Sequence, residues 1–211
     1  MADRQTAARG RRGRAWSSPK GNFAGTLVMR PRAPVAEWPL RSFTAGLATY
    51  EAVAGNLQVS DRDPRGSRLA LKWPNDVLFD DGKLAGILLE TSGDALLIGI
   101  GVNLTEAPPA EALEPDAMPP ATLGGTVTPD AFLAVLISAM ERWEQRLREE
   151  GFAPVRDEWQ KRAARIGQPI RARTGDAERR GVFEGLADDG ALILVTEAGR
   201  QHIPAADVYF R

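Results

Sequence analysis

The sequence predicts an α+β protein: a mixed β-sheet with helices, followed by a small all-β unit. Apolar runs of strand length crowd the first half of the chain, and helical apolar stripes mark residues 39–54 and 128–151. After about residue 166, five short runs alternate with turns. A chain of 211 residues is long enough for one large domain, or for a medium domain plus a small one. We place the domain boundary so that residues 1–165 and 166–211 are separate units.

Five predicted strands and one helix fill the first half. Residues 25–30 are expected to form a strand that Pro31 stops, and the helix at 39–54 follows. The other predicted strands lie at 69–73, 77–79, 84–90 and 95–103. These runs are nearly continuously apolar, so we expect burial on both faces of the sheet. Three glycines inside them predict a close approach of backbone or ligand: Gly86, Gly99 and Gly101.

The second half begins with a predicted loop at 105–127, which is rich in proline, alanine and acidic residues. A shorter, polar loop is predicted at 57–67 in the first half. Thr128-Pro129 has the form of a helix start and Gly151 that of a helix end. A second helix is predicted at about 154–165. The five short runs lie at 169–174, 180–186, 191–196, 199–203 and 206–210. Their simplest arrangement is a five-stranded barrel.

Composition excludes several classes of protein. The chain has no cysteine, which rules out disulfides and thiolate chemistry. Its one histidine, His202, falls in a predicted strand and is expected to be a packing or surface residue. No apolar run approaches the ~20 residues of a membrane span, and no secretory signal is recognisable, so we expect a cytoplasmic protein. The net charge of −1 does not suit a protein that binds nucleic acid over its whole surface.

The positive charge is concentrated near the start. Residues 1–20 carry six basic side chains and one acidic one, a net +5, which leaves −6 for the rest of the chain. Four of these arginines and two glycines form the segment 9–14. Arginine presents a permanently charged fork of donors, and glycine lets a loop fold tightly over a ligand. The segment therefore suits an enclosed phosphate or carboxylate, although a basic tail or nucleic-acid patch has the same composition.

Three further polar clusters stand at strand ends or tight turns, where functional groups gather on a rigid sheet. They are Lys72-Trp73-Pro74-Asn75-Asp76, Gly82-Lys83-Leu84-Ala85-Gly86 and Gly99-Ile100-Gly101-Val102-Asn103. Each has an ordinary structural explanation when taken alone: an edge charge, a turn former, a solvated hairpin residue or a cap. Their order and their number favour a single site.

Together with the arginine segment, these motifs resemble the catalytic domain of biotin protein ligases. The resemblance covers essentially the whole chain, including the small C-terminal unit, and implies a class II synthetase-like sheet followed by an SH3-like barrel. It implies that biotin and ATP, with Mg²⁺ as the counterion of ATP, form biotinyl-5′-AMP, and that biotin then passes to a lysine of a biotin carboxyl carrier domain. No metal site built from protein ligands is expected. A homodimer is allowed, whereas DNA and membrane partners are not implied.

The resemblance also assigns roles to residues. It implies catalysis by Lys83, Arg11 and Asp76. It implies biotin contacts from Gln5, Arg9, Gly10, Arg11 and Lys83. On the ATP or adenylate side it implies Arg9, Arg11, Arg12, Trp16, Lys72, Asn75 and Asn103.

Two departures from the family pattern matter. Alanine stands at position 8, where the family usually has glycine, and this costs loop freedom if the backbone angle there must be positive. The family's Ser-Thr-Asn segment does not occur before Gln5, so we expect an upstream strand and helix to be missing. Two alternatives therefore stay open: a lipoate-type ligase of the same fold, and an inactive remnant that binds biotin or nucleotide.

Overall fold

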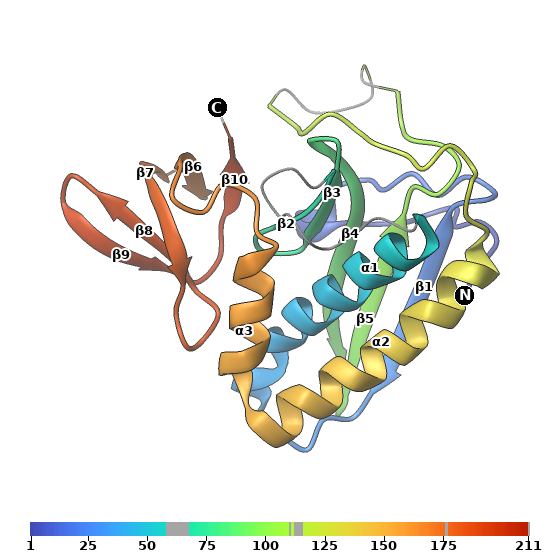
Figure 1. Cartoon of the computed structure of the whole chain (residues 1–211), viewed down its shortest axis with the longest axis horizontal. Helices are drawn as coiled ribbons and strands as arrows, with labels where there is room; N and C mark the ends of the chain where they lie inside the picture. Colours follow the sequence, from blue (N-terminus) through green and yellow to red (C-terminus); the bar gives the residue numbers. More distant parts are fainter. Residues whose placement is uncertain (58–67, 110, 112–115, 176, 211) are drawn as a thin grey trace.

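The computed structural model describes all residues except 58–67, 110, 112–115, 176 and 211. Within this described part, the strands form two five-stranded sheets (Figure 1). The larger sheet has the order β1-β5-β4-β3-β2. Its strands are β1 (Phe23–Met29), β2 (Leu69–Lys72), β3 (Asp76–Phe79), β4 (Gly82–Ser92) and β5 (Ala95–Val102).

All pairings between the strands of this sheet are antiparallel, so the predicted mixed sheet is wrong in that respect. Tight turns between β2, β3, β4 and β5 return the chain directly, and antiparallel neighbours need no longer connection. Parallel pairing is limited to two isolated bridges, Leu71 with Ala163 and Lys83 with Pro120.

Three helices cover one face of the larger sheet, in front of it in Figure 1. They are α1 (Arg41–Leu57), α2 (Pro129–Glu150) and α3 (Phe152–Lys161), with short 3₁₀ turns η1 (Arg11–Gly13) and η2 (Val35–Leu40) elsewhere. The predicted start of α2 is confirmed, because the Thr128 side chain accepts a hydrogen bond from the Ala131 amide. None of the described helices is both long and apolar enough to cross a bilayer.

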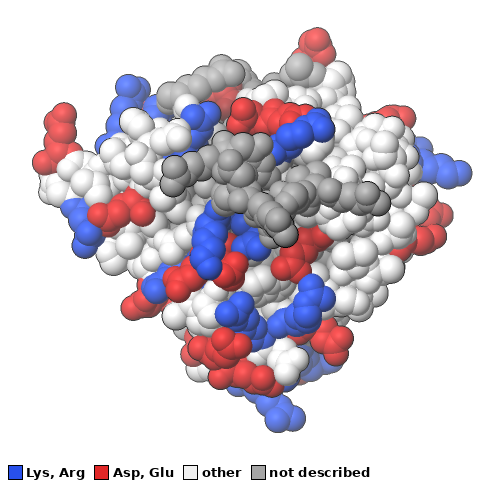
Figure 2. Space-filling model, viewed as in Figure 1, with Lys and Arg blue, Asp and Glu red and all other residues white. Residues whose placement is uncertain are grey.

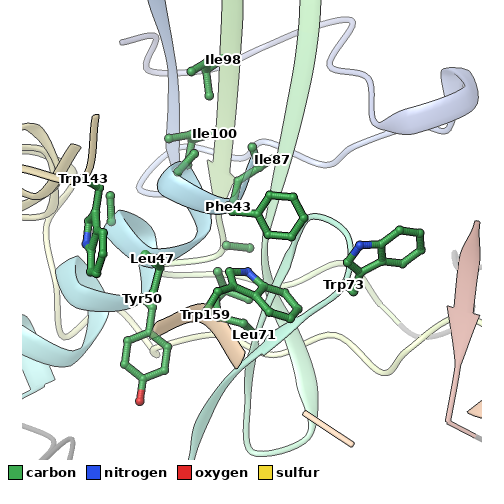
Figure 3. Close-up of a cluster of buried hydrophobic side chains, with 14 of the residues drawn as sticks. Phe43, Leu47, Tyr50, Leu71, Trp73, Ile87, Ile98, Ile100, Trp143 and Trp159 are labelled. Atoms are coloured by element: carbon green, nitrogen blue, oxygen red, sulfur yellow. The ribbon is translucent and has the colours of Figure 1, made fainter. Parts of the chain in front are cut away.

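The core lies between these helices and the sheet (Figure 3). Ile87, Ile98 and Ile100 point from β4 and β5 toward α1, where Phe43 and Leu47 are buried. Side chains alternate along these strands, and the intervening residues on the opposite face are only partly buried. The expectation of burial on both faces is therefore wrong: many positions on the second face are glycine or alanine, which keeps the runs apolar without covering that face.

The smaller sheet has the order β10-β6-β7-β8-β9. Its strands are β6 (Pro169–Thr174), β7 (Ala177–Leu186), β8 (Leu192–Thr196), β9 (Gly199–Ile203) and β10 (Asp207–Tyr209). In the described residues β9 and β10 are the two edges and do not pair, so the sheet is open where the sequence predicted a closed barrel. The chain between them contacts the arginine segment of the first domain instead, as Arg11 donates to the Ala206 carbonyl oxygen.

The two sheets are joined by a short and well-bonded connection. Ala163 pairs with Leu71 of the edge strand β2, which explains why α3 ends at Lys161 and not near 165 as predicted. The indole of Trp73 donates to the Gly190 carbonyl oxygen at 3.0 Å. These contacts hold the smaller sheet against the end of the larger one. The predicted loop at 57–67 lies outside the described residues, except for Leu57.

Candidate functional site

A cavity of about 790 Å³ opens on the face of the larger sheet that the helices leave uncovered. Its lining comes from the arginine segment, from β3, β4 and β5, and from β10 of the smaller sheet. Ten of the eleven residues to which the resemblance assigns a role line it: Gln5, Arg9, Gly10, Arg11, Trp16, Lys72, Asn75, Asp76, Lys83 and Asn103. The structure thus brings all four sequence motifs to one site.

The arginine segment folds into a tight hairpin over residues 8–16, which we call the arginine hairpin. Arg9 bridges Ala15, and the Gly10 amide donates to the Arg14 carbonyl oxygen at 2.7 Å. Gly13 has φ +73°, in the left-handed region that favours glycine. Ala8 is not among the described residues with positive φ, so alanine there carries none of the cost that the sequence raised.

Arg11 lines the cavity and is half-buried. It donates to the Asn75 side-chain oxygen at 3.4 Å and to the Ala206 carbonyl oxygen at 3.3 Å. Burial lowers the pKa of Arg11, while the nearby carboxylates Asp207 and Asp76 act in the opposite direction. The guanidinium stays charged, and it is held between polar partners from both domains.

Arg12 points elsewhere. It is not part of the cavity lining, and its guanidinium pairs with Asp207 at 2.6 Å. Arg14 pairs with the other oxygen of the same carboxylate at 3.0 Å. The Asp207 side chain is 10% exposed, so two cations meet one nearly buried anion.

A lysine–aspartate–lysine cluster forms the polar centre of the cavity. Lys83 Nζ lies 2.8 Å from Asp76 Oδ1, and Lys72 Nζ lies 3.7 Å from Asp76 Oδ2. The strand register creates this arrangement, because Lys72 pairs directly with Asp76 across β2 and β3. Lys83 follows in the next hairpin and is the most exposed of the three, with 32% of its side chain accessible.

Burial and charge set the protonation of this cluster. Burial by itself would raise the pKa of Asp76, but Lys83 and Lys72 outweigh it and the pKa is lowered. The same burial lowers the pKa of Lys72, although Asp76 opposes the change. Asp76 is therefore ionised at neutral pH and serves as the fixed counter-charge of two lysines.

Trp16 forms part of the floor of the cavity. An added Cβ would lie 2.6 Å from its indole nitrogen at Gly101 and 3.4 Å from its ring at Gly86. Glycine at these two positions is what allows the ring to lie on the sheet, which confirms the predicted close approach there. The Lys83 ammonium lies 5.6 Å from the centre of the Trp16 ring.

The two asparagines are held by backbone groups. The Asn75 amide donates to the Ile87 carbonyl oxygen at 2.6 Å, which fixes the turn between β2 and β3. The Asn103 amide donates to the Ala121 carbonyl oxygen at 3.1 Å. Asn103 Oδ1 is buried and accepts no hydrogen bond from the described residues.

Sequence reasoning missed the contribution of the smaller sheet. Asp207, Tyr209 and Phe210 line the cavity, and so does Arg171, whose guanidinium lies 5.3 Å from the centre of the Tyr209 ring. The Lys72 ammonium lies 5.7 Å from the Phe210 ring. The sequence feature that could have indicated this contribution is the single carboxylate at the start of the run Asp207-Val208-Tyr209-Phe210. Treating residues 166–211 as a separate unit hid its connection to the arginines.

Comparisons with known proteins agree with this geometry. Residues 1–104 match the model of the Biotin/lipoate A/B protein ligase family, and residues 166–211 match that of the Biotin protein ligase C terminal domain. The chain is 52% identical to the biotin--[acetyl-CoA-carboxylase] ligase of Paracoccus denitrificans, over 100% of this chain and 89% of that protein. It is 30% identical to the bifunctional ligase/repressor BirA of Bacillus subtilis, over 99% of this chain and 64% of that protein.

The fold matches as well. A biotin protein ligase from Aquifex aeolicus, solved in complex with biotin and ATP, superposes with a TM-score of 0.82 at 26% identity. The match covers 98% of this chain and 86% of that one. The chain therefore belongs to the biotin/lipoate A/B protein ligase family, and it is an enzyme of the ligase class.

Proposed function

We propose that the protein activates biotin with ATP to give biotinyl-5′-AMP and then transfers biotin to a lysine of a biotin carboxyl carrier domain. The observation that carries this proposal is the convergence of Arg9, Arg11, Lys72 and Lys83 on one cavity whose central carboxylate, Asp76, is already neutralised. The 52% identity to a biotin ligase over the whole chain selects biotin as the acid. A lipoate-type activity is not favoured.

The first step joins two anions. A carboxylate oxygen of biotin attacks the α-phosphorus of ATP, a phosphorus–oxygen bond forms, and pyrophosphate leaves with the electron pair of the bond that breaks. Fixed cations lower this barrier because they stabilise the charge that builds up in the transition state. Lys83 is the residue that we place between carboxylate and α-phosphate, since it is the more accessible lysine of the cluster.

The remaining roles are proposed from the family resemblance, and they are supported by the presence of these residues in the cavity lining. Arg9 and Arg11 hold the carboxylate and phosphate groups, and Gly10 lets the backbone approach them. Gln5, at the start of the lining, binds the biotin head group. Trp16, Asn75 and Asn103 belong to the adenylate side, where Asn103 Oδ1 is a buried acceptor without a partner among the described residues.

Asp76 acts as an anchor for the two lysines. Its lowered pKa makes it a poor proton acceptor at neutral pH, because a carboxylate that gives up its charge there would leave two ammonium groups unpaired. In the second step the carrier lysine amine attacks the acyl carbon of the adenylate, the bond from that carbon to the phosphate oxygen breaks, AMP leaves with its electron pair, and the amine releases one proton to water. The cavity orients that amine and keeps water away from the anhydride.

Magnesium is proposed only as the counterion that ATP carries. No group of three His, Asp or Glu side chains capable of holding a metal occurs among the described residues. Asp76 is occupied by lysines, and the other carboxylates of the lining, Glu90, Asp116 and Asp207, form no such group among the described residues. A magnesium ion bound mainly by phosphates and water fits such a site, since Mg²⁺ usually keeps several waters.

The domain division and partners remain inferences. We propose residues 1–165 as the catalytic domain and 166–211 as the C-terminal domain, which the two separate sheets support. On the face shown in Figure 2, basic and acidic side chains are interspersed, which does not favour a polyanion partner. The expected cytoplasmic location, and the homodimer that the resemblance allows, stay predictions.

The test uses the purified protein with ATP, biotin and a carrier domain in its unmodified form. We expect biotin-dependent release of pyrophosphate, and addition of one biotin to the carrier. A carrier domain in which the target lysine is replaced by arginine is the matched control and should remain unmodified. Lipoic acid in place of biotin separates the two acids: a higher rate with lipoate, or no pyrophosphate release with biotin, would contradict the proposal.

A further inference from the structure

The smaller sheet reaches the arginine hairpin through one short segment, Ala206-Asp207. Asp207 accepts from Arg12 at 2.6 Å and from Arg14 at 3.0 Å, one guanidinium on each carboxylate oxygen. The neighbouring Ala206 carbonyl oxygen accepts from Arg11 at 3.3 Å. Three arginines of the hairpin are thus bound by two consecutive residues that lie more than 190 positions later in the chain.

This contact differs from the exposed ion pairs of the surface. Asp207 is 9% exposed as a residue, whereas the pair of Arg30 and Asp94 has side chains that are 68% and 77% exposed. Exposed pairs contribute little, but a nearly buried carboxylate that lost its cations would be left unpaired. The strand register also orients Asp207, because β10 pairs with β6 from Asp207 to Tyr209.

We propose that Asp207 is a positioning residue for the ligase reaction: it clamps the arginine hairpin over the cavity through Arg12 and Arg14, and so sets where Arg9 and Arg11 stand. The proposal rests on the proposed function of the cavity. It divides the work of the hairpin. Arg12 and Arg14 fasten it to the smaller sheet through Asp207, while Arg9, Arg11 and also Arg14 line the cavity.

The backbone of the hairpin makes this division reasonable. Arg12 has φ +57°, a left-handed conformation that is uncommon for a residue with a side chain, and this turn is what separates the directions of Arg11 and Arg12. A residue in such a conformation persists where its surroundings over-determine it, and the pair with Asp207 supplies that constraint. Without the Asp207 carboxylate, the hairpin would lose the two ion pairs that Arg12 and Arg14 make with the smaller sheet.

The first experiment measures the clamp without any turnover. Limited digestion with trypsin, which cuts after arginine, reports how often residues 9–14 open in the free protein. We expect Asp207→Asn to be cut in this segment about tenfold faster than the unchanged protein, because opening exposes the chain to protease. Asp188→Asn is the matched control: it removes a carboxylate from the same domain, but its side chain is 97% exposed.

The second experiment measures the reaction. Asp207→Asn is expected to lower the rate of biotin-dependent pyrophosphate release by about 10²-fold, since small misplacements of binding groups have effects of that size. It should also increase the fraction of biotinyl-AMP that escapes into solution. Asp207→Glu keeps the charge and should recover part of the rate, which a purely structural defect would not predict.

A double-mutant cycle shows whether Asp207 affects the reaction through Arg12 and Arg14. If Asp207 acts through Arg12 and Arg14, the change Asp207→Asn should have little further effect in a protein that already carries Arg12→Gln and Arg14→Gln. Additive losses would overturn the proposal. So would a lower KM for ATP in Asp207→Asn with unchanged trypsin cleavage, because Asp207 would then compete with phosphate for the arginines.

These outcomes separate the clamp from the proposed function. If the unchanged protein forms no adenylate, the proposed function fails, and the trypsin comparison still decides whether Asp207 holds the hairpin. If the unchanged protein is active and Asp207→Asn matches it in both rate and cleavage, the clamp alone is wrong. Should Asp207→Asn fail to fold, Asp207→Glu carries both tests, and the Arg12→Gln, Arg14→Gln protein carries the rate test together with cleavage at the two bonds after Arg9 and Arg11.

Discussion

The cavity is built from two charged regions that hold their charges in different ways. In the lysine–aspartate–lysine cluster, Asp76 and Lys72 each have side chains that are 10% exposed, and the rigid pairing of β2 with β3 sets their separation. In the arginine hairpin, Arg12 and Arg14 are 44% and 40% exposed, and their partner Asp207 belongs to the other sheet. The first region depends on local strand register and the second on the contact between domains.

The two regions therefore differ in how freely their charges can move. A buried cluster on paired strands cannot open without breaking the sheet, so it suits groups that must stand still during the reaction. A hairpin held by side-chain contacts to another sheet can open where those contacts break, so it suits groups that admit a ligand and then cover it. We expect substitutions in the cluster to affect stability and chemistry, and substitutions in the hairpin to affect enclosure.

The largest effect is expected for Asp76→Asn. This change removes the shared counter-charge and leaves the buried Lys72 ammonium unpaired, which typically costs about 3–5 kcal/mol of unfolding free energy. Chemical denaturation measures it. Asp94→Asn, in an exposed ion pair, is the control and should stay within about 1 kcal/mol.

The same variant also tests how the stability that Asp76 contributes depends on pH. The folded pKa of Asp76 lies below its ordinary value of 3.8, so the ionised carboxylate stabilises the fold above that value. This contribution is lost as the pH falls through the folded pKa. The stability gap between the unchanged protein and Asp76→Asn should therefore be full at neutral pH and shrink in acid; a gap that widens in acid would contradict the assigned role.

The next effect concerns chemistry. Lys83→Ala should lower biotin-dependent pyrophosphate release by ~10²–10³-fold, because one group that stabilises transition-state charge is removed. Its side chain is partly exposed, so the fold should persist. Lys161→Ala, at an exposed lysine of α3, is the matched control. A rate within a few-fold of the unchanged protein would place the catalytic charge in the hairpin instead.

A smaller effect is expected where Trp16 of the arginine hairpin lies against β5 of the larger sheet. Gly101→Ala would put a Cβ 2.6 Å from the Trp16 indole nitrogen, so the ring must shift or the strand must give. Overpacking of this kind typically costs about 1–3 kcal/mol. We expect a change in tryptophan fluorescence together with weaker adenylate binding. Gly93→Ala is no clean control because its φ is +58°; Gly99→Ala, with its nearest contact at 3.6 Å, is the better one.

The smallest effect is expected for an exposed ion pair outside the cavity. Arg30→Gln breaks an ion pair between two exposed side chains, and the unfolding free energy should change by less than about 1 kcal/mol. Denaturation in low and high salt measures the residual contribution. A loss as large as that of Asp76→Asn would show that exposure does not govern the strength of ion pairs in this protein.

Local chemistry in the sequence determined much of the structure. The cap at Thr128, the run of α2 and the hairpins of β3, β4 and β5 follow from side-chain preferences and spacing over a few residues. The motifs around Lys72, Lys83 and Asn103 could be recognised because each is short and contiguous. The glycines that admit Trp16 were also predicted, though the sequence could not identify the ring that covers them.

Tertiary structure decided everything that joins distant parts of the chain. The antiparallel order, the open smaller sheet and the one-sided burial depend on which strands meet, and no short segment encodes this. Arg12 was assigned to the nucleotide, yet it pairs with Asp207, 195 residues away. The strength of that pair arises because docking of the smaller sheet removes water from the carboxylate, and desolvation is a property of the assembled fold and not of either segment.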